Sequence, residues 1–506
     1  MQKKLGLVVL LLAFIMIWSG SMAEAKTLVI GTTQEAMGLD GRVEPGVAEA
    51  ERSNTIMEAL ACFNHDMELT PRLATNWEHS DDGLQITFYL REGVTFHHGR
   101  EFVAQDVKYT YEWLLDPEND APNRSLYVDI EEIEIVNDHE VIFHLNQPNG
   151  FLINNIARMN IVPYDKAEEL GDQFGSQPVG TGPFMFDSWR RDDRLVLKAN
   201  PDYWGGAPKV DELQFRPIPD DSARLMAFEA GEIDMFQSGI DPQEIERLEN
   251  DPNIIVGRTP GPGYEYVGFN QMSPYMNDYR IRQAVSHLID RRGIVDHVLG
   301  GVGSPAYSPI PPMLPQHHDG LEPHAYDPEK ARELLAEAGY PDGGFSLTLH
   351  ASEQAHRIEI AEILAYELGQ LGVDVEVRIE EWGAFWDRIM HTTDYDMYIL
   401  SWHGQLDPDR ATHRQFHSDG GRYPYIYYDN ARVNMLLDEG RVVPADSERS
   451  LELYREVQEI LYRDVPYAFI FYIEEIAVSH PYITGFEVHP YHPASWENAH
   501  LFDKTN

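Results

Sequence analysis

The stretch from Trp77 to Val107 places the tightest limits on how this chain can fold. Asp81-Asp82-Gly83 has the composition of a tight turn, and the segment 85–90 that follows alternates polar and apolar residues. A period of two is typical of a strand that buries one face. The side chains expected on that face are Ile86, Phe88 and Leu90. The helical pattern 107–115 comes next, so the stretch predicts a strand pair followed by a helix.

Four motifs carry a resemblance to a known family. They are the stretch just described, Pro71-Arg72-Leu73-Ala74 before it, Val179-Gly180-Thr181-Gly182-Pro183-Phe184, and Asn200-Pro201-Asp202-Tyr203-Trp204-Gly205-Gly206. Together they resemble the family 5 extracytoplasmic solute-binding proteins, which are the dipeptide, oligopeptide and nickel receptors of ABC importers. The resemblance implies an α/β chain with a two-lobed periplasmic binding protein-like fold. The implied fold is type II and belongs to the large cluster of such proteins. It has mixed sheets flanked by helices and an extra subdomain in the first lobe.

The length of the chain also requires more than one unit. Its 506 residues are too many for a single hydrophobic core. The resemblance implies that the strand 264–270 carries the chain into the second lobe and that 467–478 carries it back. The expected units are a signal peptide at 1–25, a first lobe at 26–265 with the extra subdomain at about 45–180, a second lobe at 266–474, and a return to the first lobe at 475–506.

The N-terminus has the three parts of a signal peptide. Lys3-Lys4 is a basic start, 5–18 is an apolar run, and Ala23-Glu24-Ala25 is a small-x-small cleavage site. An uncleaved anchor is the alternative, but the run is shorter than the roughly 20 residues of a spanning helix. The only cysteine is Cys62, which excludes an internal disulfide and a lipid-modified cysteine at the cleavage site. We therefore expect export to the periplasm, cleavage after Ala25, no lipid anchor and no membrane insertion afterwards.

The charge of the chain excludes some partners. The formal net charge is −45, and such a charge repels nucleic acid and anionic lipid. Two explanations remain open. One is a hydrated acidic surface that suits salty surroundings, and the other is an acidic ligand-binding face.

Two helical predictions concern single residues. The run 51–63 is predicted to be a helix that holds Cys62 as a small core residue, not as a nucleophile. The run 279–289 is predicted to be a helix with one apolar stripe. The arginines expected on the solvated side of this region are Arg280, Arg282, Arg291 and Arg292.

The second half of the chain alternates strands and helices. A strand at 347–349, a helix at 358–371 and a period-two strand at 373–379 are typical of a parallel α/β unit. Asp327 and Pro328 signal the start of another helix, which Gly339 ends. The segment 396–402 is the next predicted strand, and 446–463 is an amphipathic helix.

Two segments are candidates for a ligand site, because ligands collect at the carboxyl ends of strands in open α/β sheets. One follows the strand 373–379 and contains Trp382, Phe385 and Trp386. The other follows the strand 396–402 and contains Trp402, His403, Gln405 and Asp407. Indole faces can stack on peptide planes, sugar rings or organic chelates. Core packing is the alternative for any one tryptophan, and Asp407 is also placed to cap the next helix.

The resemblance adds further site residues and one departure. It implies that Tyr264 and Asn270 in the hinge strand, and Asp40 in the first loop, lie near the ligand. Similar peptide receptors place an aspartate three residues after the tryptophan that Trp402 matches, where it pairs with the peptide's α-ammonium. Gln405 stands there in this chain, and an amide cannot neutralise a desolvated cation.

No cofactor is predicted, and a metal site is a second alternative. His413 and His417 have the i, i+4 spacing of one helix face, and His403 is near in sequence. The resemblance adds that nickel receptors of the family use histidine in this region.

The sequence therefore predicts a non-enzymatic receptor that captures a small-molecule or peptide ligand between two lobes and delivers it to an inner-membrane ABC permease. It is expected to be a monomer without nucleic-acid partners. Metal chelates, oligosaccharides and opine-like compounds are the alternative ligands. A secreted hydrolase is the alternative of another class, but the sequence has no Gly-x-Ser-x-Gly, His-Glu-x-x-His or cysteine-histidine signature.

Overall fold

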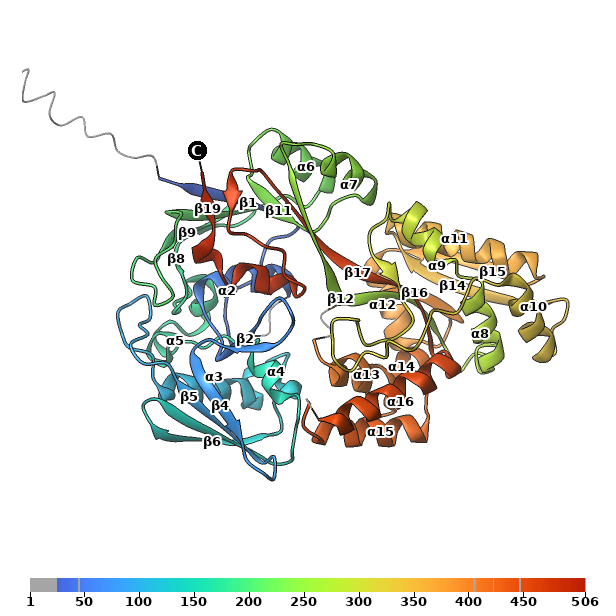
Figure 1. The fold of residues 1–506 in the computed structure, drawn as a ribbon, viewed down its shortest axis with the longest axis horizontal. Helices are drawn as coiled ribbons and strands as arrows, with labels where there is room; N and C mark the ends of the chain where they lie inside the picture. The colour runs from blue at the N-terminus through green and yellow to red at the C-terminus, as the bar shows by residue number, and fades with distance from the viewer. Residues whose placement is uncertain (1–24, 44–45, 404–405, 422, 446, 506) are drawn as a thin grey trace, which may run out of the picture.

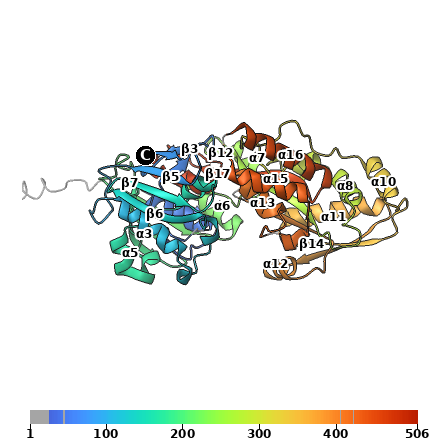
Figure 2. The same ribbon diagram turned by 90° about the horizontal axis from the view of Figure 1, so that it is seen from below.

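The computed structural model describes residues 25–43, 46–403, 406–421, 423–445 and 447–505. The signal-peptide prediction therefore falls almost entirely outside the described residues. Figure 1 shows two bodies: one holds the beginning and the end of the described chain, and the other holds most of residues 270–470. Figure 2 shows the two bodies side by side along the long axis. Among the described residues, no helix is both long enough and apolar enough to cross a membrane.

Two long antiparallel strands connect the bodies, β12 (Ile255–Phe269) and β17 (Tyr467–Ser479). Their register shifts between Pro260 and Tyr264, where the strands pass from one lobe to the other. On the first-lobe side β17 pairs with β11 (Met235–Gln237), and on the second-lobe side β12 pairs with β16 (Met397–Trp402). One sheet therefore runs continuously through both lobes.

The first lobe completes this sheet with four more strands. They are β1 (Thr27–Thr32), β8 (Phe184–Arg190), β9 (Arg194–Ala199) and β10 (Glu212–Pro217). β1 runs parallel to β10 and β11, whereas β9 is antiparallel to its neighbours β8 and β10. The main helices of this part are α2 (Val47–Ile56), α6 (Asp221–Glu229) and α7 (Pro242–Glu249).

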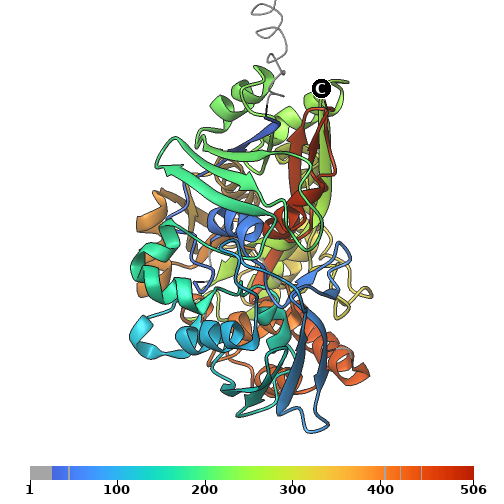
Figure 3. The same cartoon turned by 90° about the vertical axis from the view of Figure 1, so that its left-hand side faces the viewer.

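A separate four-stranded sheet contains the stretch from Trp77. Its order is β4 (Ala74–His79), β5 (Gln85–Leu90), β7 (Glu140–Leu145) and β6 (Ile130–Asn137), all antiparallel. Ile86, Phe88 and Leu90 are buried on one face, as predicted, in a core that they share with α3 (Ala104–Leu115). Figures 1 and 3 place this sheet at the end of the lobe away from α6 and α7.

Three of the four motifs of the resemblance meet at one buried carboxylate, Glu58. It accepts hydrogen bonds of 2.8 Å from Arg72 Nε, Thr181 Oγ1, Tyr203 Oη and Trp204 Nε1. Gly180 and Gly182 of the motif 179–184 are also fixed by packing, because a Cβ on either residue would clash with the backbone carbonyl group of Ile56. These motifs therefore hold the first lobe together and lie inside it.

The second lobe has the predicted parallel unit. β14 (Ser346–Ser352) runs parallel to β15 (Asp374–Glu380) and to β16. One face packs under α8 (Tyr279–His287), α10 (Pro328–Glu337) and α11 (Ala355–Gln370). The other face packs under α12 (Trp382–His391), α13 (Pro408–Phe416), α14 (Tyr423–Ile426), α15 (Ala431–Val442) and α16 (Glu448–Asp464).

The predicted helix 51–63 is wrong in its second half. The helix ends at Ile56, and β2 (Ala61–Phe63) forms a hairpin with β3 (Leu69–Pro71). The Asn64 side chain holds the turn by accepting hydrogen bonds from the backbone N–H groups of Asp66 and Glu68. Cys62 is thus half-buried in a strand, and burial raises the pKa of its thiol to about 11, which favours the protonated thiol at neutral pH.

The prediction of four solvated arginines is wrong for two of them. Arg282 and Arg291 are 3% and 5% exposed. Arg282 donates to the carbonyl oxygens of Asp464 and Val465 at the end of α16, and Arg291 donates to the Phe469 carbonyl in β17. Helical periodicity could not reveal these roles, because the acceptors lie about 180 residues away in the sequence.

Candidate functional site

The candidate site lies where the second-lobe sheet ends against the hinge. β14, β15 and β16 all end at this edge, and α11 and α12 begin there. A cleft of about 1030 Å³ separates this edge from the region of α6 and α7 in the first lobe. Second-lobe residues such as Arg357 and His403 line one wall, and first-lobe residues such as Phe236 and Ile240 line the other. The cleft is therefore enclosed by both lobes.

A stack of aromatic side chains runs from the surface into the second lobe. Trp382 is 49% exposed and stacks on Trp386, with ring centroids 5.4 Å apart. Trp386 meets Trp402 edge to face at 6.5 Å, and Trp402 lies parallel to Tyr266 and Tyr425 at 6.4 and 6.2 Å. Three of the predicted tryptophans thus come together, and Trp382 and Trp386 offer partly exposed rings.

A buried ion pair forms the floor of the cleft beside Trp402. Arg357 donates from Nε to Glu265 Oε1 at 2.5 Å and from its terminal nitrogens to Glu265, Ser401 and Ser352. The guanidinium holds the pKa of Glu265 at about 2, against the effect of burial, so the carboxylate stays charged. Sequence reasoning missed both residues. The available signal was Glu265, the one charged residue in an otherwise uncharged run, 264–269.

His403 lies next to this ion pair. Its Nε2 is 3.2 Å from Ser401 Oγ, which in turn accepts from Arg357, and the residue is exposed in the cleft lining. Because side chains alternate along β16, Ser401 points toward Arg357 whereas Trp402 points toward the aromatic stack. The last residues of one strand therefore supply both a polar and an aromatic surface.

The hinge itself carries a second charged cluster. His492 Nε2 lies 2.5 Å from Glu51 in α2, and its Nδ1 lies 3.2 Å from Glu475 in β17. The two carboxylates raise the pKa of His492 to about 10, despite its burial. This imidazolium ties the C-terminal segment and α2 to the strand that crosses between the lobes.

The side chains of three predicted ligand contacts are buried in this structure. Tyr264 and Phe385 have no exposed surface and lie in the second-lobe core. Asn270 is also fully buried, and its side-chain N–H groups are donated to the carbonyl oxygens of Thr393 and Tyr395. Asn270 therefore holds the loop before β16, and its side-chain N–H groups are already used inside the lobe.

The other predicted residues have mixed outcomes. Asp407 is buried and caps α13, where it accepts from the backbone N–H of Arg410, as its alternative role predicted. Asp40 is committed to Arg42, with hydrogen bonds to both the backbone and the guanidinium. Gln405 lies outside the described residues.

The three histidines proposed as metal ligands do not lie together in the structure. His413 and His417 stack at 4.3 Å beside Asp438, whereas His403 lies in the cleft lining. His417 Nδ1 accepts the backbone N–H of Asp419, so a neutral ring carries its proton on Nε2, 3.3 Å from Asp438. A metal at Nε2 would have to displace that proton while Nδ1 is also unprotonated. His417 would therefore have to release the Asp419 N–H before its Nε2 could bind a metal, although His413, His417 and Asp438 offer ligand atoms within 4.8 Å of one another.

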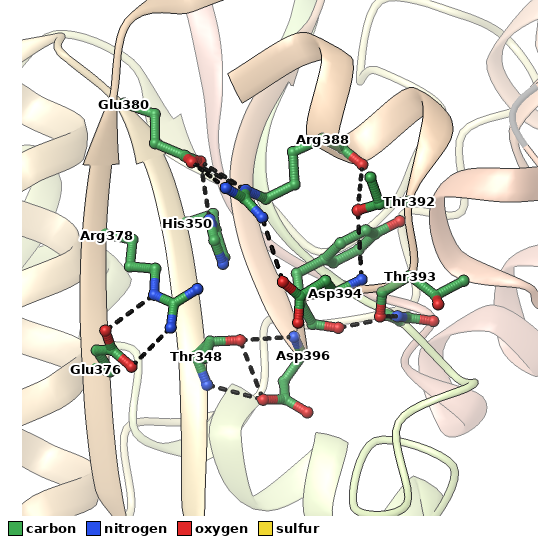
Figure 4. A network of polar contacts seen from close by, with 12 residues as sticks. Thr348, His350, Glu376, Arg378, Glu380, Arg388, Thr392, Thr393, Asp394 and Asp396 are labelled. Atoms are coloured by element: carbon green, nitrogen blue, oxygen red, sulfur yellow. Dashed lines mark hydrogen bonds and ion pairs between the residues drawn. The ribbon is translucent and has the colours of Figure 1, made fainter. Parts of the chain in front are cut away.

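A polar network anchors the helix that carries Trp382 and Trp386. His350 and Arg388 both converge on Glu380, at 2.8 and 2.9 Å, as Figure 4 shows. Glu380 is the last residue of β15 and Arg388 lies in α12. The network therefore fixes α12, and with it Trp382 and Trp386, to the end of the sheet.

Comparison with known proteins assigns the family. A model of the bacterial extracellular solute-binding proteins, family 5 (middle part), matches residues 68–423. The chain belongs to this family. Family 5 proteins are receptors of ABC transporters and not enzymes, so the residues of the cleft need only bind and position a solute.

Individual relatives agree with this assignment. The di/tripeptide-binding protein 2 of Pseudomonas aeruginosa is 30% identical over 88% of this chain and 89% of its own. Heme-binding protein A of Haemophilus influenzae is 28% identical over 94% of this chain and 93% of its own. The periplasmic binding protein DppA of Helicobacter pylori, solved with the peptide STSA, is 27% identical, covers 95% of this chain and 98% of its own, and superposes with a TM-score of 0.80. The periplasmic binding protein fold is therefore confirmed.

Proposed function

We propose that this family 5 protein is a periplasmic receptor that captures a peptide-like small polar solute between its lobes and delivers it to an inner-membrane permease. The observation that carries the proposal is the cleft of about 1030 Å³ that both lobes enclose. A volume of this size is sufficient for a small ligand. The cleft is lined by the rings of Phe236 and Phe471 and by polar groups such as Ser401 and Arg357, and the tryptophan stack lies beside it at the end of β16.

Hinge closure is the proposed mechanism. β12 and β17 would bend where their register is already irregular, between Pro260 and Tyr264. The contacts of Gly150 with Arg441 in α15 and of Phe151 with Tyr454 in α16 would also have to shift. A solute that contacts both walls stabilises the closed state by its differential affinity for it. The proposal includes the domain limits near 265 and 474, the extra subdomain at about 45–180, a monomer, and cleavage after Ala25.

Peptides come first among the ligands for two reasons. Relatives that bind di- and tripeptides or the peptide STSA match nearly the whole chain. The stacked tryptophans and the polar edge at Ser401 also suit a chain with alternating peptide planes and side chains. A chelate, oligosaccharide or opine-like solute is the second candidate, because Gln405 replaces the expected aspartate and a heme-binding relative is as similar.

A thermal-shift screen tests the proposal. The mature protein is heated with di- and tripeptides, glutathione, oligosaccharides, opines, and nickel with and without chelators. A ligand at a hundred times its Kd adds roughly 2.7 kcal/mol to the native state. Stabilisation by peptides supports the proposal. Stabilisation only by chelates, sugars or opines replaces the ligand class, and turnover of any bound compound contradicts the receptor function.

A further inference from the structure

The charges of the cleft define the substrate class more closely. We propose that the cleft selects peptides with a positively charged side chain over neutral ones and excludes acidic ones. This inference rests on the proposed function as a peptide receptor. It adds a specificity rule that acts through the walls of the cleft.

Both walls of the cleft are acidic. Six carboxylates and two guanidinium groups line it. The first lobe contributes carboxylates from α6, α7 and the turn before α7, and the second lobe contributes them from β12 and α11. The six are Asp221, Glu229, Asp241, Glu244, Glu265 and Glu359.

Both lining arginines are already neutralised inside the walls. Arg357 is 3% exposed and is saturated by Glu265, Ser401 and Ser352. Arg247 bridges Glu244 at 2.6 Å and Glu229 at 2.8 Å. A carboxylate of an incoming solute would therefore have to compete with a protein carboxylate for either guanidinium. Such competition leaves one anion without a partner.

Of the three remaining carboxylates, Asp221 pairs with the buried Arg224 at 2.5 Å, whereas Glu359 and Asp241 have no such compensation. Glu359 is exposed on α11, and no described residue pairs with it. Asp241 on the opposite wall accepts only the backbone N–H of Gln243 at the start of α7. Glu229 and Glu244 share the single positive charge of Arg247, so one of these two negative charges is not neutralised. Closure of the lobes brings these like charges nearer to one another, which is unfavourable unless a cation lies between them.

The acidity of the whole chain does not remove this effect. A net charge of −45 makes an acidic cleft unsurprising, but a solute in the cleft responds to the charges that face it. The test must therefore change one cleft carboxylate and compare it with a carboxylate on the same helix outside the cleft. Glu359 and Glu362 offer this pair, because both are exposed on α11 and only Glu359 lines the cleft.

The experiment incubates the mature protein with an equimolar pool of random tripeptides at pH 7.5 and low ionic strength. Retained peptides are identified by mass spectrometry. Affinities are then measured by calorimetry for Ala-Lys-Ala, Ala-Gln-Ala and Ala-Glu-Ala. We expect Ala-Lys-Ala to bind about tenfold more tightly than Ala-Glu-Ala. The difference in affinity between Ala-Lys-Ala and Ala-Glu-Ala should become smaller in 0.5 M salt and in the variant Glu359→Lys. It should not change in the variant Glu362→Lys.

Each outcome decides between the proposals. Enrichment of Lys and Arg among the retained peptides, with a gap that Glu359→Lys reduces, supports the inference. Retention of neutral or acidic peptides overturns the charge rule and leaves the peptide receptor standing. An equal response of Glu359→Lys and Glu362→Lys also overturns it, because the preference then comes from the overall charge. Retention of no peptide overturns the proposed peptide function and this inference with it.

Discussion

The two lobes use buried carboxylates in opposite ways. In the first lobe, Glu58 accepts four hydrogen bonds from residues of the family motifs and is closed off from the cleft. In the second lobe, Glu265 is just as buried, but its partner Arg357 reaches Ser401 at the cleft edge. The strongest family motifs therefore specify the fold, whereas the cleft-facing surface is built from residues outside those motifs.

Removal of Glu58 should have the largest effect on stability. In Glu58→Ala, the buried Arg72 guanidinium loses its carboxylate and three more donors lose their acceptor. We expect a loss of about 3–5 kcal/mol in the free energy of unfolding, measured by urea denaturation. Affinity for a ligand should change little where the protein remains folded. A loss below about 1 kcal/mol would show that the first lobe does not depend on this carboxylate.

Acid should weaken the second-lobe ion pair next. The folded pKa of Glu265 is about 2, below its usual value near 4.5, so its stabilisation is complete above pH 4.5 and is lost as the pH falls toward 2. The shift corresponds to about 3 kcal/mol. Urea denaturation at several pH values should therefore show a smaller acid-induced loss in Glu265→Gln than in the wild type. The control Glu362→Gln should keep the wild-type slope, and equal slopes in all three proteins would contradict the assignment.

Truncation of Trp402 should remove binding without unfolding the protein. The ring is half-buried between Trp386, Tyr425 and Tyr266, at the end of β16. We expect Trp402→Ala to cost about 2 kcal/mol of ligand affinity by calorimetry, while circular dichroism stays native. Trp189→Ala is a matched control, because this half-buried tryptophan lies in β8 of the first lobe. Equal affinity in the wild type and Trp402→Ala would remove this strand end from the site.

The outermost ring of the stack should have the smallest effect. Trp382 is half-exposed and packs mainly on Trp386. Trp382→Ala should weaken binding by about 1 kcal/mol and change the unfolding free energy by less than about 0.5 kcal/mol. Trp382→Phe should restore part of the affinity because it keeps an aromatic face. If Trp382→Ala costs as much affinity as Trp402→Ala, the solute lies nearer to α12 than we propose.

Much of the fold follows from local sequence patterns. The parallel unit around β14 and β15, the strand with Phe88 and the capped helix after Asp327 have clear periodicity and terminal residues, and the structure contains each of them. The helix through Cys62 was mispredicted because an apolar run of that length suits a helix or a strand, and the Asn64 turn decides between them.

The candidate site was less predictable because its contacts are distant in sequence. The tryptophans could be placed at strand ends, which is a local property. The ion pair of Glu265 and Arg357 joins residues 92 positions apart, and the burial of Asn270 depends on the loop at 393–395. His403 was grouped with His413 and His417 because it is near them in sequence. In the structure, the acidic neighbour of His413 and His417 is Asp438 in α15.

A crystal structure with a bound tripeptide such as Ala-Lys-Ala would show whether the two lobes close on a peptide in this cleft. We predict that the peptide lies between the two walls of the cleft, against Trp402 or Trp386 and beside Ser401, with the lobes closer together than in Figure 1. Its lysine side chain should face Glu359 or Asp241. A peptide bound elsewhere, or bound with the lobes unmoved, would contradict the proposal that closure of this cleft captures the solute.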